Sequence, residues 1–542
     1  MQEMINKLNF GKFQICEDGI LQPVSKDGET ELKVVFPQKI IPSGILHNIT
    51  TENDKLQIHF YRGNEWKSVI VEKNIIANKN KIIELANKGV AVNSLNSSNL
   101  VNYLSVMENI NYSKLPYSLE TSQLGWFKDK FLPYAEDIKL SKIDGLNMET
   151  FTQNGNFDEW LRATNIARNS HLFFRIVLAS EFASPLLKLT GVLGAITHLW
   201  GSTGTGKSVA LMCGASVWGL PANDDGIIIT FNSTKVGCEL ICDYLQNMPL
   251  NIDELETANK SNNDDIVYLI TQGKGKIRGK AGGGIANIGK WKLWGISTGE
   301  HPITDNNSKG GAINRIINLQ TSSSLLKGFD DVNDVCNAWR NNYGFAGKKF
   351  IEYIKTLDKN EIIAKYNNYN TQFIKTGATG KQSMAGAMLM LADELANECI
   401  FKDNLKLKID DFYGIVLSET EVSRAERLYN QVFDWVAGNL RHFNNSENVD
   451  QWGEYVKNDN GDVIKININR IILDTYFLKD INSKAIYTEW KKAGHIESDD
   501  DRLTKQVRLN GIRYRCICIL APQEEKKHNF EPIEDENIDL PF

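Results

Sequence analysis

Residues 199–208 read LWGSTGTGKS, and from Gly201 to Ser208 they fit the pattern G-x-x-x-x-G-K-[ST]. Apolar residues dominate both flanks, 192–200 before the pattern and 209–215 after it, which predicts a strand, a glycine-rich loop and a helix in succession. Glycines let backbone N–H groups turn toward an anion, and the start of the following helix adds the positive end of its dipole. These flanks disfavour the alternative, an ordinary Gly/Ser/Thr-rich turn. The stretch therefore predicts a phosphate-binding loop.

The residues of this loop suit a nucleoside triphosphate with a divalent cation. Lys207 supplies a cation for the β- and γ-phosphates, and the hydroxyl of Ser208, in the first helical turn, suits Mg²⁺. ATP and Mg²⁺ are therefore the expected cofactors. The residues that we expect to surround the nucleotide are Gly201, Ser202, Thr203, Gly204, Thr205, Gly206, Lys207, Ser208 and Val209.

Composition and charge limit the class of protein. The chain has 542 residues, 42% of them hydrophobic and 24% charged, which is typical of a globular protein of about three or four domains. The net charge of −6 is small, so a nucleic-acid surface would have to be local. Eight cysteines without a C-x-x-C pair disfavour zinc and indicate free thiols. Without a signal peptide or an apolar run approaching about 18 residues, a cytoplasmic protein with no membrane span is expected.

The order of patterns along the chain predicts four parts. Alternating runs between 13 and 75, followed by helices near 79–88 and 98–110, predict a mainly antiparallel β unit, so residues 1–150 are expected to form an N-terminal α+β scaffold. Residues 151–445 would form the nucleotide-binding α/β domain, entered through two helices between 158 and 189. Helices near 469–478 and 484–493, with a hairpin at Asn510-Gly511, make 446–521 look like a winged helix. The acidic tail 522–542 is expected to be disordered.

Hydrolysis of a triphosphate needs a carboxylate on Mg²⁺ and a base for the attacking water. Asp253 and Glu254 follow the short run 250–252 and offer that pair. The competing stretch 388–394 also ends in Asp-Glu, but its Ala, Met and Leu composition is typical of a helix. Isolated Asp-Glu pairs are common on solvated surfaces, so Asp253 and Glu254 gain specificity from their place between the loop and the features that follow.

A basic, glycine-rich stretch comes next. Between Val267 and Gly299 there are six Lys or Arg residues and no acid, and the segment around Gly279 carries Lys274, Lys276, Arg278 and Lys280. Such a segment suits a DNA phosphate backbone, where each neutralised contact adds affinity without reading sequence. A solvated loop is the alternative.

Two further polar positions follow buried-looking runs. Ser297 and Thr298 come at the end of the predicted strand 291–296, where a polar side chain could orient the lytic water or contact the γ-phosphate. Arg315 interrupts the otherwise apolar run 310–319, which we interpret as a strand. Burying an arginine needs an anionic partner, so Arg315 is a candidate arginine finger; the alternative is a surface arginine on a half-exposed strand.

In this order the motifs resemble a bacterial P-loop family catalogued as a domain of unknown function, which includes the MCM-like AAA+ helicases of staphylococcal cassette chromosome and pathogenicity-island elements. Further stretches that carry the resemblance are the Trp126 region, Trp160, 198–201, 217–219, 272–278, 296–300 and 311–315, and it covers about residues 10–443. It implies an AAA+ core that assembles as a ring, a hexamer, and unwinds DNA to replicate a mobile element.

The resemblance also implies roles for individual residues. It makes Lys207 and Ser208 the Walker A pair, Asp253 and Glu254 the Walker B pair, and Ser297 or Thr298 the sensor 1 position. Arg315 becomes the finger that reaches the neighbouring subunit's nucleotide. Lys274, Lys276, Arg278 and Lys280 look like the pore-facing hairpin, and Lys381 is the nearest match to a sensor 2 cation. Asn251 departs from the usual apolar Walker B strand.

Two functions from different classes fit these residues. The first is the ring helicase, with single-stranded or forked DNA, copies of the chain and other replication proteins as partners. The second is a nucleotide-dependent loader or initiator switch that remodels a partner without translocating. A metabolic kinase is a distant third, because it needs neither a finger nor a basic hairpin.

Overall fold

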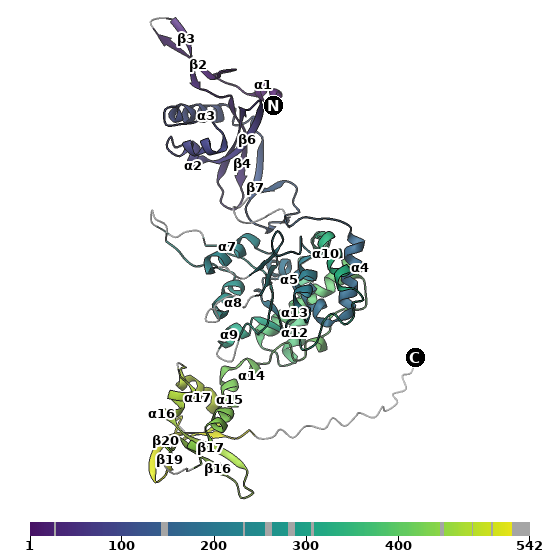
Figure 1. The fold of residues 1–542 in the computed structure, drawn as a ribbon, viewed down its shortest axis with the longest axis vertical. Coiled ribbons are helices and arrows are strands. Elements are labelled where there is room, and N and C mark those ends of the chain that lie inside the picture. Colours follow the sequence, from purple (N-terminus) through teal and green to yellow (C-terminus); the bar gives the residue numbers. More distant parts are fainter. Residues whose placement is uncertain are drawn as a thin grey trace, which may run out of the picture. The chain divides into compact units, whose positions relative to one another are not determined.

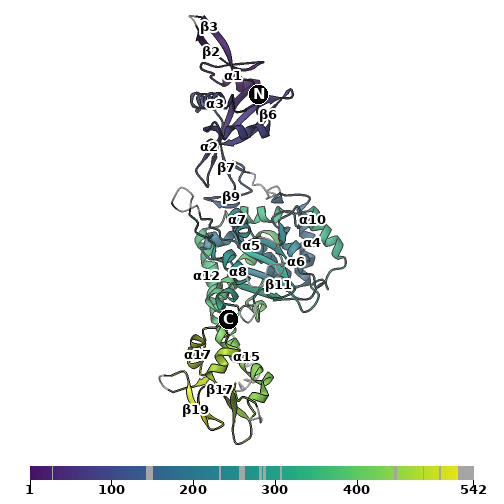
Figure 2. The ribbon, with the colours of Figure 1, turned by 60° about the vertical axis from the view of Figure 1, so that its left-hand side comes forward.

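The computed structural model describes residues 1–26, 29–141, 150–230, 234–254, 263–279, 284, 288–304, 308–444, 449–479, 481–499 and 502–522. The chain divides into two compact units, Met1–Ile303 with Arg315–Val416, and Thr304–Asn314 with Leu417–Phe542. Figures 1 and 2 show the elements of each unit in two views. Within the described ranges, no helix combines the length and the apolar character that crossing a membrane requires.

The N-terminal part is a mainly antiparallel β structure, as the alternating runs predict. After α1 (Gln2–Lys7), the strands β1 (Gln14–Cys16), β2 (Gly19–Lys26) and β3 (Glu29–Phe36) form an antiparallel sheet. A second sheet has the order β10-β7-β4-β5-β6, built from β4 (Ile40–Asn48), β5 (Asp54–Arg62), β6 (Glu65–Glu72), β7 (Tyr117–Thr121) and β10 (Ile138–Leu140). α2 (Lys73–Ile76), a 3₁₀ turn (Ile82–Lys88) and α3 (Ser97–Asn111) follow β6, and β8 (Gly125–Phe127) pairs with β9 (Lys130–Leu132). The buried Tyr103 hydroxyl donates to the Ile40 carbonyl at 2.7 Å and ties α3 to the sheet.

A five-stranded parallel sheet forms the centre of the first unit. Its order is β12-β13-β14-β11-β15, with β11 (Ile196–Trp200), β12 (Ile228–Thr230), β13 (Leu250–Asp253), β14 (Gly295–Gly299) and β15 (Ile316–Gln320). Because all neighbouring pairs are parallel, the carboxyl ends of these strands lie at one edge. The expected α/β class is confirmed, and the structure shows that its central sheet is parallel. The strand order also places β14 between the strand that precedes the glycine-rich loop and the strand that ends at Asp253.

Helices surround this sheet (Figures 1 and 2). α4 (Phe157–Ser170) and α5 (Leu172–Thr190) are the two helices expected before the loop, and α5 packs against both α6 (Lys207–Ala215) and α13 (Gly380–Ala396). The stretch 388–394 lies inside α13, so its composition correctly predicted a helix. The other helices of the unit are α7 (Lys235–Leu245), α8 (Asn263–Gln272), α10 (Val332–Asn341), α11 (Phe345–Ile354) and α12 (Lys359–Lys375), with a π-helical turn at Asn397–Phe401.

A buried ion-pair network ties α4 to α13. The fully buried Arg168 donates to both carboxylate oxygens of Asp403 at 3.0 Å and to Asp393 at 3.3 Å. Its guanidinium also lies 3.9 Å from the ring centroid of Phe401. Burial raises the pKa of Asp393 against the opposing effect of Arg168. The arginine therefore compensates an otherwise unfavourable buried carboxylate.

The expected strand over 310–319 is partly wrong. Residues Gly310–Ile313 form the short helix α9, and β15 begins only at Ile316. The Asn314 N–H donates to the Gly310 carbonyl at 3.0 Å and closes this helical turn. Arg315 therefore precedes the strand and is half-buried.

The second unit is built on an antiparallel sheet. Besides α9 and a 3₁₀ turn (Leu440–His442), the unit contains α14 (Glu419–Val422), α15 (Arg424–Gly438), α16 (Arg470–Ile472) with a π-helical turn (Leu473–Phe477), and α17 (Ser483–Lys492). The sheet has the order β16-β17-β20-β18, with β19 paired to β20: β16 (Gly453–Lys457), β17 (Val463–Asn469), β18 (Ile496–Glu497), β19 (Lys505–Leu509) and β20 (Ile512–Leu520). Asn510 and Gly511 both have positive φ, 48° and 79°, which confirms the predicted two-residue hairpin. Most of the acidic tail, 523–542, lies outside the described residues.

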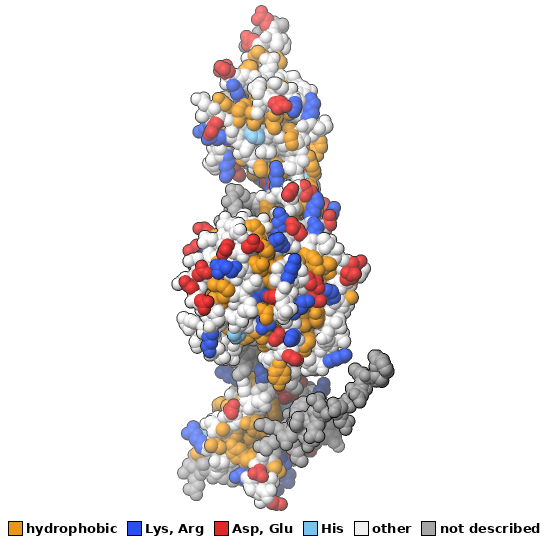
Figure 3. All heavy atoms as spheres, turned by 90° about the vertical axis from the view of Figure 1, so that its right-hand side faces the viewer, with side chains coloured by type: hydrophobic (Ala, Val, Ile, Leu, Met, Phe, Trp, Pro, Cys, Tyr) orange, Lys and Arg blue, Asp and Glu red, His pale blue; other side chains and the backbone are white. Residues whose placement is uncertain are grey.

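Charge is dispersed over the face seen in Figure 3. Basic and acidic side chains are interspersed there, with hydrophobic side chains between them. This distribution agrees with the small net charge of −6.

Candidate functional site

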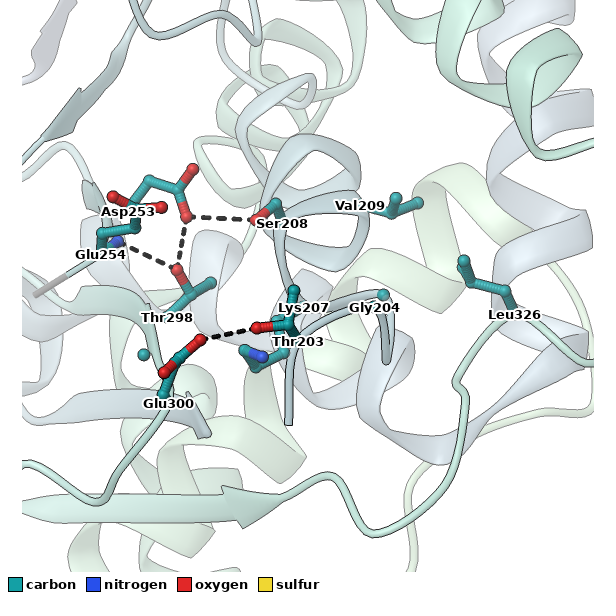
Figure 4. A pocket seen from close by; sticks show the side chains of 12 residues that line it. Thr203, Gly204, Lys207, Ser208, Val209, Asp253, Glu254, Thr298, Glu300 and Leu326 are labelled. Carbon is teal, nitrogen blue, oxygen red and sulfur yellow. Dashed lines mark hydrogen bonds between the residues drawn. The ribbon is translucent and has the colours of Figure 1, made fainter. Parts of the chain in front are cut away.

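A cavity of about 570 Å³ lies at the carboxyl ends of β11, β13 and β14 (Figure 4). It combines the glycine-rich loop after β11, the acidic end of β13 and the polar end of β14. Its lining residues are Thr203, Gly204, Gly206, Lys207, Ser208, Val209, Asp253, Glu254, Thr298, Gly299, Glu300 and Leu326.

The glycine-rich loop needs glycine at two close approaches. At Gly201 φ is 142°, and a Cβ atom there would lie 2.5 Å from the Thr321 carbonyl oxygen. At Gly206 φ is 96°, and a Cβ atom would lie 2.8 Å from Leu326. The segment that carries Thr321 also supports the loop by hydrogen bonds, since the Thr205 and Thr321 hydroxyls are 2.9 Å apart. The loop is therefore built from local glycines and held by a segment distant in sequence.

Lys207 begins α6, and its ammonium group bends back over the loop. It donates to the carbonyl oxygens of Gly201 at 2.7 Å and of Ser202 at 2.8 Å. The charge of Lys207 thus lies within the loop, at the positive end of the helix dipole. This combination favours an anion at the loop.

Asp253 is the centre of a hydrogen-bond network that spans the cavity (Figure 4). Its Oδ1 accepts from the Thr298 hydroxyl at 2.5 Å and from the Ser208 hydroxyl at 3.3 Å, and its Oδ2 accepts from the Asn223 amide at 3.2 Å. The Glu254 N–H donates to the same Thr298 hydroxyl at 3.2 Å. Three neighbouring elements, α6, β13 and β14, are therefore joined through one carboxylate and one hydroxyl.

The donor set suits a hard divalent cation. Ser208 and Asp253 present oxygen ligands, which Mg²⁺ prefers, and Mg²⁺ is commonly held by one or two side chains together with phosphates. Among the residues that the structure describes, no cluster of three or more His, Cys, Asp or Glu side chains could hold a metal by itself. Ser208 and Asp253 could hold Mg²⁺ together with phosphate oxygens.

Ser297 does not lie in the cavity, unlike its neighbour Thr298. It is fully buried, and its hydroxyl lies 2.9 Å from His198 Nδ1. His198 Nε2 lies 2.9 Å from the His301 carbonyl oxygen, so Nε2 must carry the proton and Nδ1 accepts from Ser297. Burial lowers the pKa of His198 to about 4, which keeps the ring neutral. The inclusion of Ser297 among the nucleotide contacts is thus corrected, because successive strand residues point to opposite faces.

Glu300 is a cavity residue that the sequence analysis did not assign. Its Oε1 accepts from the Thr203 hydroxyl at 2.6 Å, across the mouth of the loop. The available signal was its position two residues after Thr298, at the same strand end. Spacing alone could not show that the carboxylate reaches a loop residue 97 positions earlier.

Arg315 lies at the opposite edge of the sheet from the cavity. Ile316 pairs with Ile196 at the start of β11, so Arg315 is about 16 Å from the loop at a rise of about 3.3 Å per residue. Its guanidinium lies 4.9 Å from the ring centroid of Tyr268, and its charge adds to burial in lowering the pKa of Lys381. The fold therefore brings Arg315 and Lys381 near each other and separates both from their own chain's cavity.

The basic segment forms an antiparallel ribbon. Lys274 bridges to Lys290, the Gly275 N–H donates to the Gly289 carbonyl at 2.9 Å, and Lys274 and Lys276 are exposed. Arg278 makes a bidentate ion pair with Glu239 of α7, at 2.7 and 2.9 Å, so Glu239 would share this arginine with any DNA phosphate, and its role as a DNA contact stays a prediction. Residues 267–299 contain no acidic residue, but the fold places Glu239 of α7 against Arg278. Lys280 lies outside the described residues.

Comparison with known protein families gives two matches. Residues 13–290, just over half of the chain, match the family model described as a domain of unknown function, DUF927, and residues 423–524 match the Cch helix turn helix domain. The motif-based resemblance to a family catalogued as a domain of unknown function is therefore confirmed. No curated protein matches the chain.

Solved structures give a likeness of fold. One described as "SCCmec type IV Cch - active helicase" aligns with a TM-score of 0.67 and 18% identity, covering 94% of this chain and 98% of the other. Another, described as the A form apo structure of the NrS-1 C terminal region, has a TM-score of 0.31 and 12% identity, covering 89% and 96% of the two chains. The first likeness shows a shared fold over nearly the whole chain.

Proposed function

The chain belongs to the family described as a domain of unknown function, DUF927, and we propose that it is an ATP-driven DNA helicase, an MCM-like AAA+ ring motor for replication of a mobile genetic element. The observation that carries the proposal is the single cavity in which Lys207, Asp253 and Thr298 meet. A cationic loop, a carboxylate for Mg²⁺ and a polar group at the neighbouring strand end are the parts that cleavage of a triphosphate by water requires. The fold shared with a protein described as an active helicase supports the choice of motor.

We propose that the glycine-rich loop holds the phosphates of ATP. Lys207 would exchange its bonds to the loop carbonyls for bonds to phosphate oxygens, which carry more charge. Ser208 and Asp253 would hold Mg²⁺, which neutralises developing phosphate charge when bound. Thr298 would keep the Asp253 carboxylate aimed at the cavity through its hydrogen bond.

Glu254 is the proposed base for the attacking water. It lines the cavity and has a left-handed backbone with φ 53°, a conformation that costs a non-glycine residue about 1–3 kcal/mol. The bond from its N–H to Thr298 helps to hold that conformation. One hydroxyl would therefore position both acidic residues.

Arg315 is the proposed arginine finger of a neighbouring subunit. It lies at the sheet edge opposite the cavity, so it cannot serve the nucleotide of its own chain. An arginine presented beside Lys381 at that edge would suit the phosphates bound by an adjacent copy. Because each site would need an arginine from the next copy, hydrolysis would depend on assembly into a ring. We propose that this ring has six subunits.

DNA binding is proposed for two basic surfaces. The first is the ribbon with the exposed Lys274 and Lys276. The second is the exposed face of the β19–β20 hairpin, where Arg508 lies directly opposite Arg513, with Arg515 beside them. Like charges that face each other across two strands are destabilising, and an anionic partner such as a phosphate backbone would offset that repulsion. We also propose a division of the chain into four parts. These are a scaffold domain over 1–150, a motor domain over 151–445, a winged-helix-like DNA-binding domain over 446–521 and an acidic tail over 522–542.

The proposed motor is tested by complementation between inactive variants. Lys207→Ala and Arg315→Ala should each abolish DNA-stimulated ATP hydrolysis and unwinding of a forked substrate. A mixture of the two should regain part of the hydrolysis, because some interfaces then pair an intact Lys207 with an intact Arg315. Lys375→Ala, at an exposed lysine that ends α12, is the matched control. No recovery on mixing, with both variants folded, would contradict a shared site.

The alternative, a loader or initiator switch, predicts a different result at the ribbon. Replacing Lys274 and Lys276 by alanine should abolish unwinding in a helicase while ATP hydrolysis continues. A loader should tolerate the loss of both charges. Measuring particle size by light scattering, with an ATP analogue and forked DNA, shows whether either activity accompanies a ring.

A further inference from the structure

Four aromatic rings in the C-terminal unit lie nearly parallel around Trp452. His442 stacks on Trp452 with ring centroids 3.8 Å apart and an interplanar angle of 9°. Tyr476 stacks on it at 5.0 Å and 12°, and Trp435 lies at 5.9 Å and 12°. The rings come from four separate segments of the chain, so the fold assembles this aromatic stack and no local repeat produces it.

One side of the aromatic stack belongs to the core, and the Tyr476 side does not. Trp435 and Trp452 pack, half-buried, against the hydrophobic cluster of the unit. Tyr476 is 58% exposed although one face of its ring is covered by Trp452. So much exposure requires that the other face of the ring be open to solvent. Ile471, at the start of the same helical segment, is 72% exposed.

Two exposed arginines, Arg441 and Arg470, accompany the aromatic stack, and the exposed Asp450 is also close to it in the chain. Arg441 Nε donates to His442 Nε2 at 3.3 Å, and His442 Nδ1 lies 2.8 Å from the Asp450 carbonyl oxygen. Hydrogen bonds therefore hold both nitrogens of His442 in place, with the exposed Arg441 guanidinium at the edge of the ring. Arg470, also exposed, begins the helical segment that carries Tyr476.

The nearest acid on that segment is turned to other partners. Asp474 accepts from Arg470 Nε at 3.3 Å through one oxygen and from the Tyr487 hydroxyl at 2.6 Å through the other. The Tyr476 side thus combines an open aromatic face with nearby arginines. A ligand that fits has a flat ring and a negatively charged backbone.

We propose that the open face of Tyr476 binds an unstacked base of single-stranded DNA, with Arg441 and Arg470 near the adjoining phosphates. The proposal rests on the function above, in which the protein separates strands. Bases inside a duplex cover one another's faces and offer only their edges, so this site distinguishes single strands from duplex. Stacking accepts any base, because every base has a π-face, so the contact carries little sequence preference.

The test measures binding of the full-length protein to a fluorescent oligothymidylate by anisotropy, over a salt series and without ATP. Tyr476→Ala should weaken binding about 5- to 150-fold, the range for loss of one base–aromatic stack. Tyr476→Phe keeps the ring and should bind within about twofold of the unaltered protein. Tyr413→Ala removes a tyrosine that is 94% exposed elsewhere and should have no effect. A duplex of equal length should bind all four proteins alike.

Salt dependence separates stacking from charge. Tyr476→Ala should leave the slope of log affinity against log salt unchanged, whereas Arg441→Gln should reduce it by about one. Unaltered affinity in Tyr476→Ala, equal loss in the Phe variant, or equal loss on duplex would overturn the proposal and leave the motor intact. Association with a protein lost in Tyr476→Ala, with DNA affinity unchanged, would do the same. If the unaltered protein binds no single strand, the proposed helicase itself fails.

Discussion

Replacing Thr298 by valine is the sharpest test of the cavity. The substitution keeps the shape of the side chain but removes the hydroxyl that donates to Asp253 at 2.5 Å and accepts from the Glu254 N–H at 3.2 Å. A hydrogen bond to a charged group contributes about 1.5–3 kcal/mol. If that contribution positions the two acidic residues in the transition state, ATP turnover should fall about 10- to 150-fold.

The neighbouring residue offers a matched control. Ser297→Ala also removes a hydroxyl from β14, but this one faces His198 on the buried side of the strand. Leaving the His198 nitrogen without its donor should cost about 1–3 kcal/mol of unfolding free energy. Turnover per folded molecule should stay unchanged. Thr298→Ser, which keeps the hydroxyl, should retain most of the activity.

Three measurements on each variant complete the experiment. Steady-state ATP hydrolysis at saturating ATP and Mg²⁺ gives kcat, binding of a fluorescent ATP analogue gives affinity, and thermal unfolding gives stability. We expect Thr298→Val to change kcat with little effect on affinity or Tm. The reasoning is refuted if Thr298→Val turns over ATP at the unaltered rate, or if Ser297→Ala loses as much activity without unfolding.

Three further predictions concern other charged groups. Arg168→Met should lower the free energy of unfolding by about 3–5 kcal/mol in urea denaturation, because it leaves the buried Asp393 uncompensated, and a loss below about 1 kcal/mol would contradict this. Hydrogen bonds from Lys465 and, to a smaller extent, from Lys505 lower the pKa of Glu497 to about 2. The resulting stabilisation is present above the ordinary pKa of 4.5 and is lost as the pH falls toward 2. The Tm of Glu497→Gln should therefore depend less on pH in that window than the Tm of the unaltered protein. Glu300→Gln removes a negative charge from the cavity but keeps an acceptor, so KM for ATP should fall about twofold to tenfold with kcat unchanged, whereas a large loss of kcat would make Glu300 the base.

Some features could be predicted because their physical cause is local. The loop around Gly206 follows from residues that are adjacent in the chain, and so does the two-residue turn at Asn510-Gly511. The helix over 388–394 follows from the low cost of Ala, Met and Leu in a helix. The expected strand through Gly310 was wrong because an apolar run alone does not distinguish a strand from a short helical turn.

The site itself depended on partners far apart in sequence. In the sequence, Arg278 is one of several similar basic residues. In the structure it is distinguished by an ion pair with Glu239, which lies 39 positions away in the chain. Glu300 gains a place in the cavity by reaching Thr203, 97 positions away. Pairing energies of this kind depend on distances that sequence spacing does not contain.

The amino-acid sequence by itself determined the α/β class, the position of the glycine-rich loop and the family to which the chain belongs. Only the tertiary structure decided that Thr298 enters the cavity while Ser297 turns away, and that Arg315 stands at the opposite edge of the sheet. The reason is geometric. Alternation along a strand says that neighbouring side chains face opposite ways, but which one faces the loop follows from the order of the strands and from how helices cover the sheet.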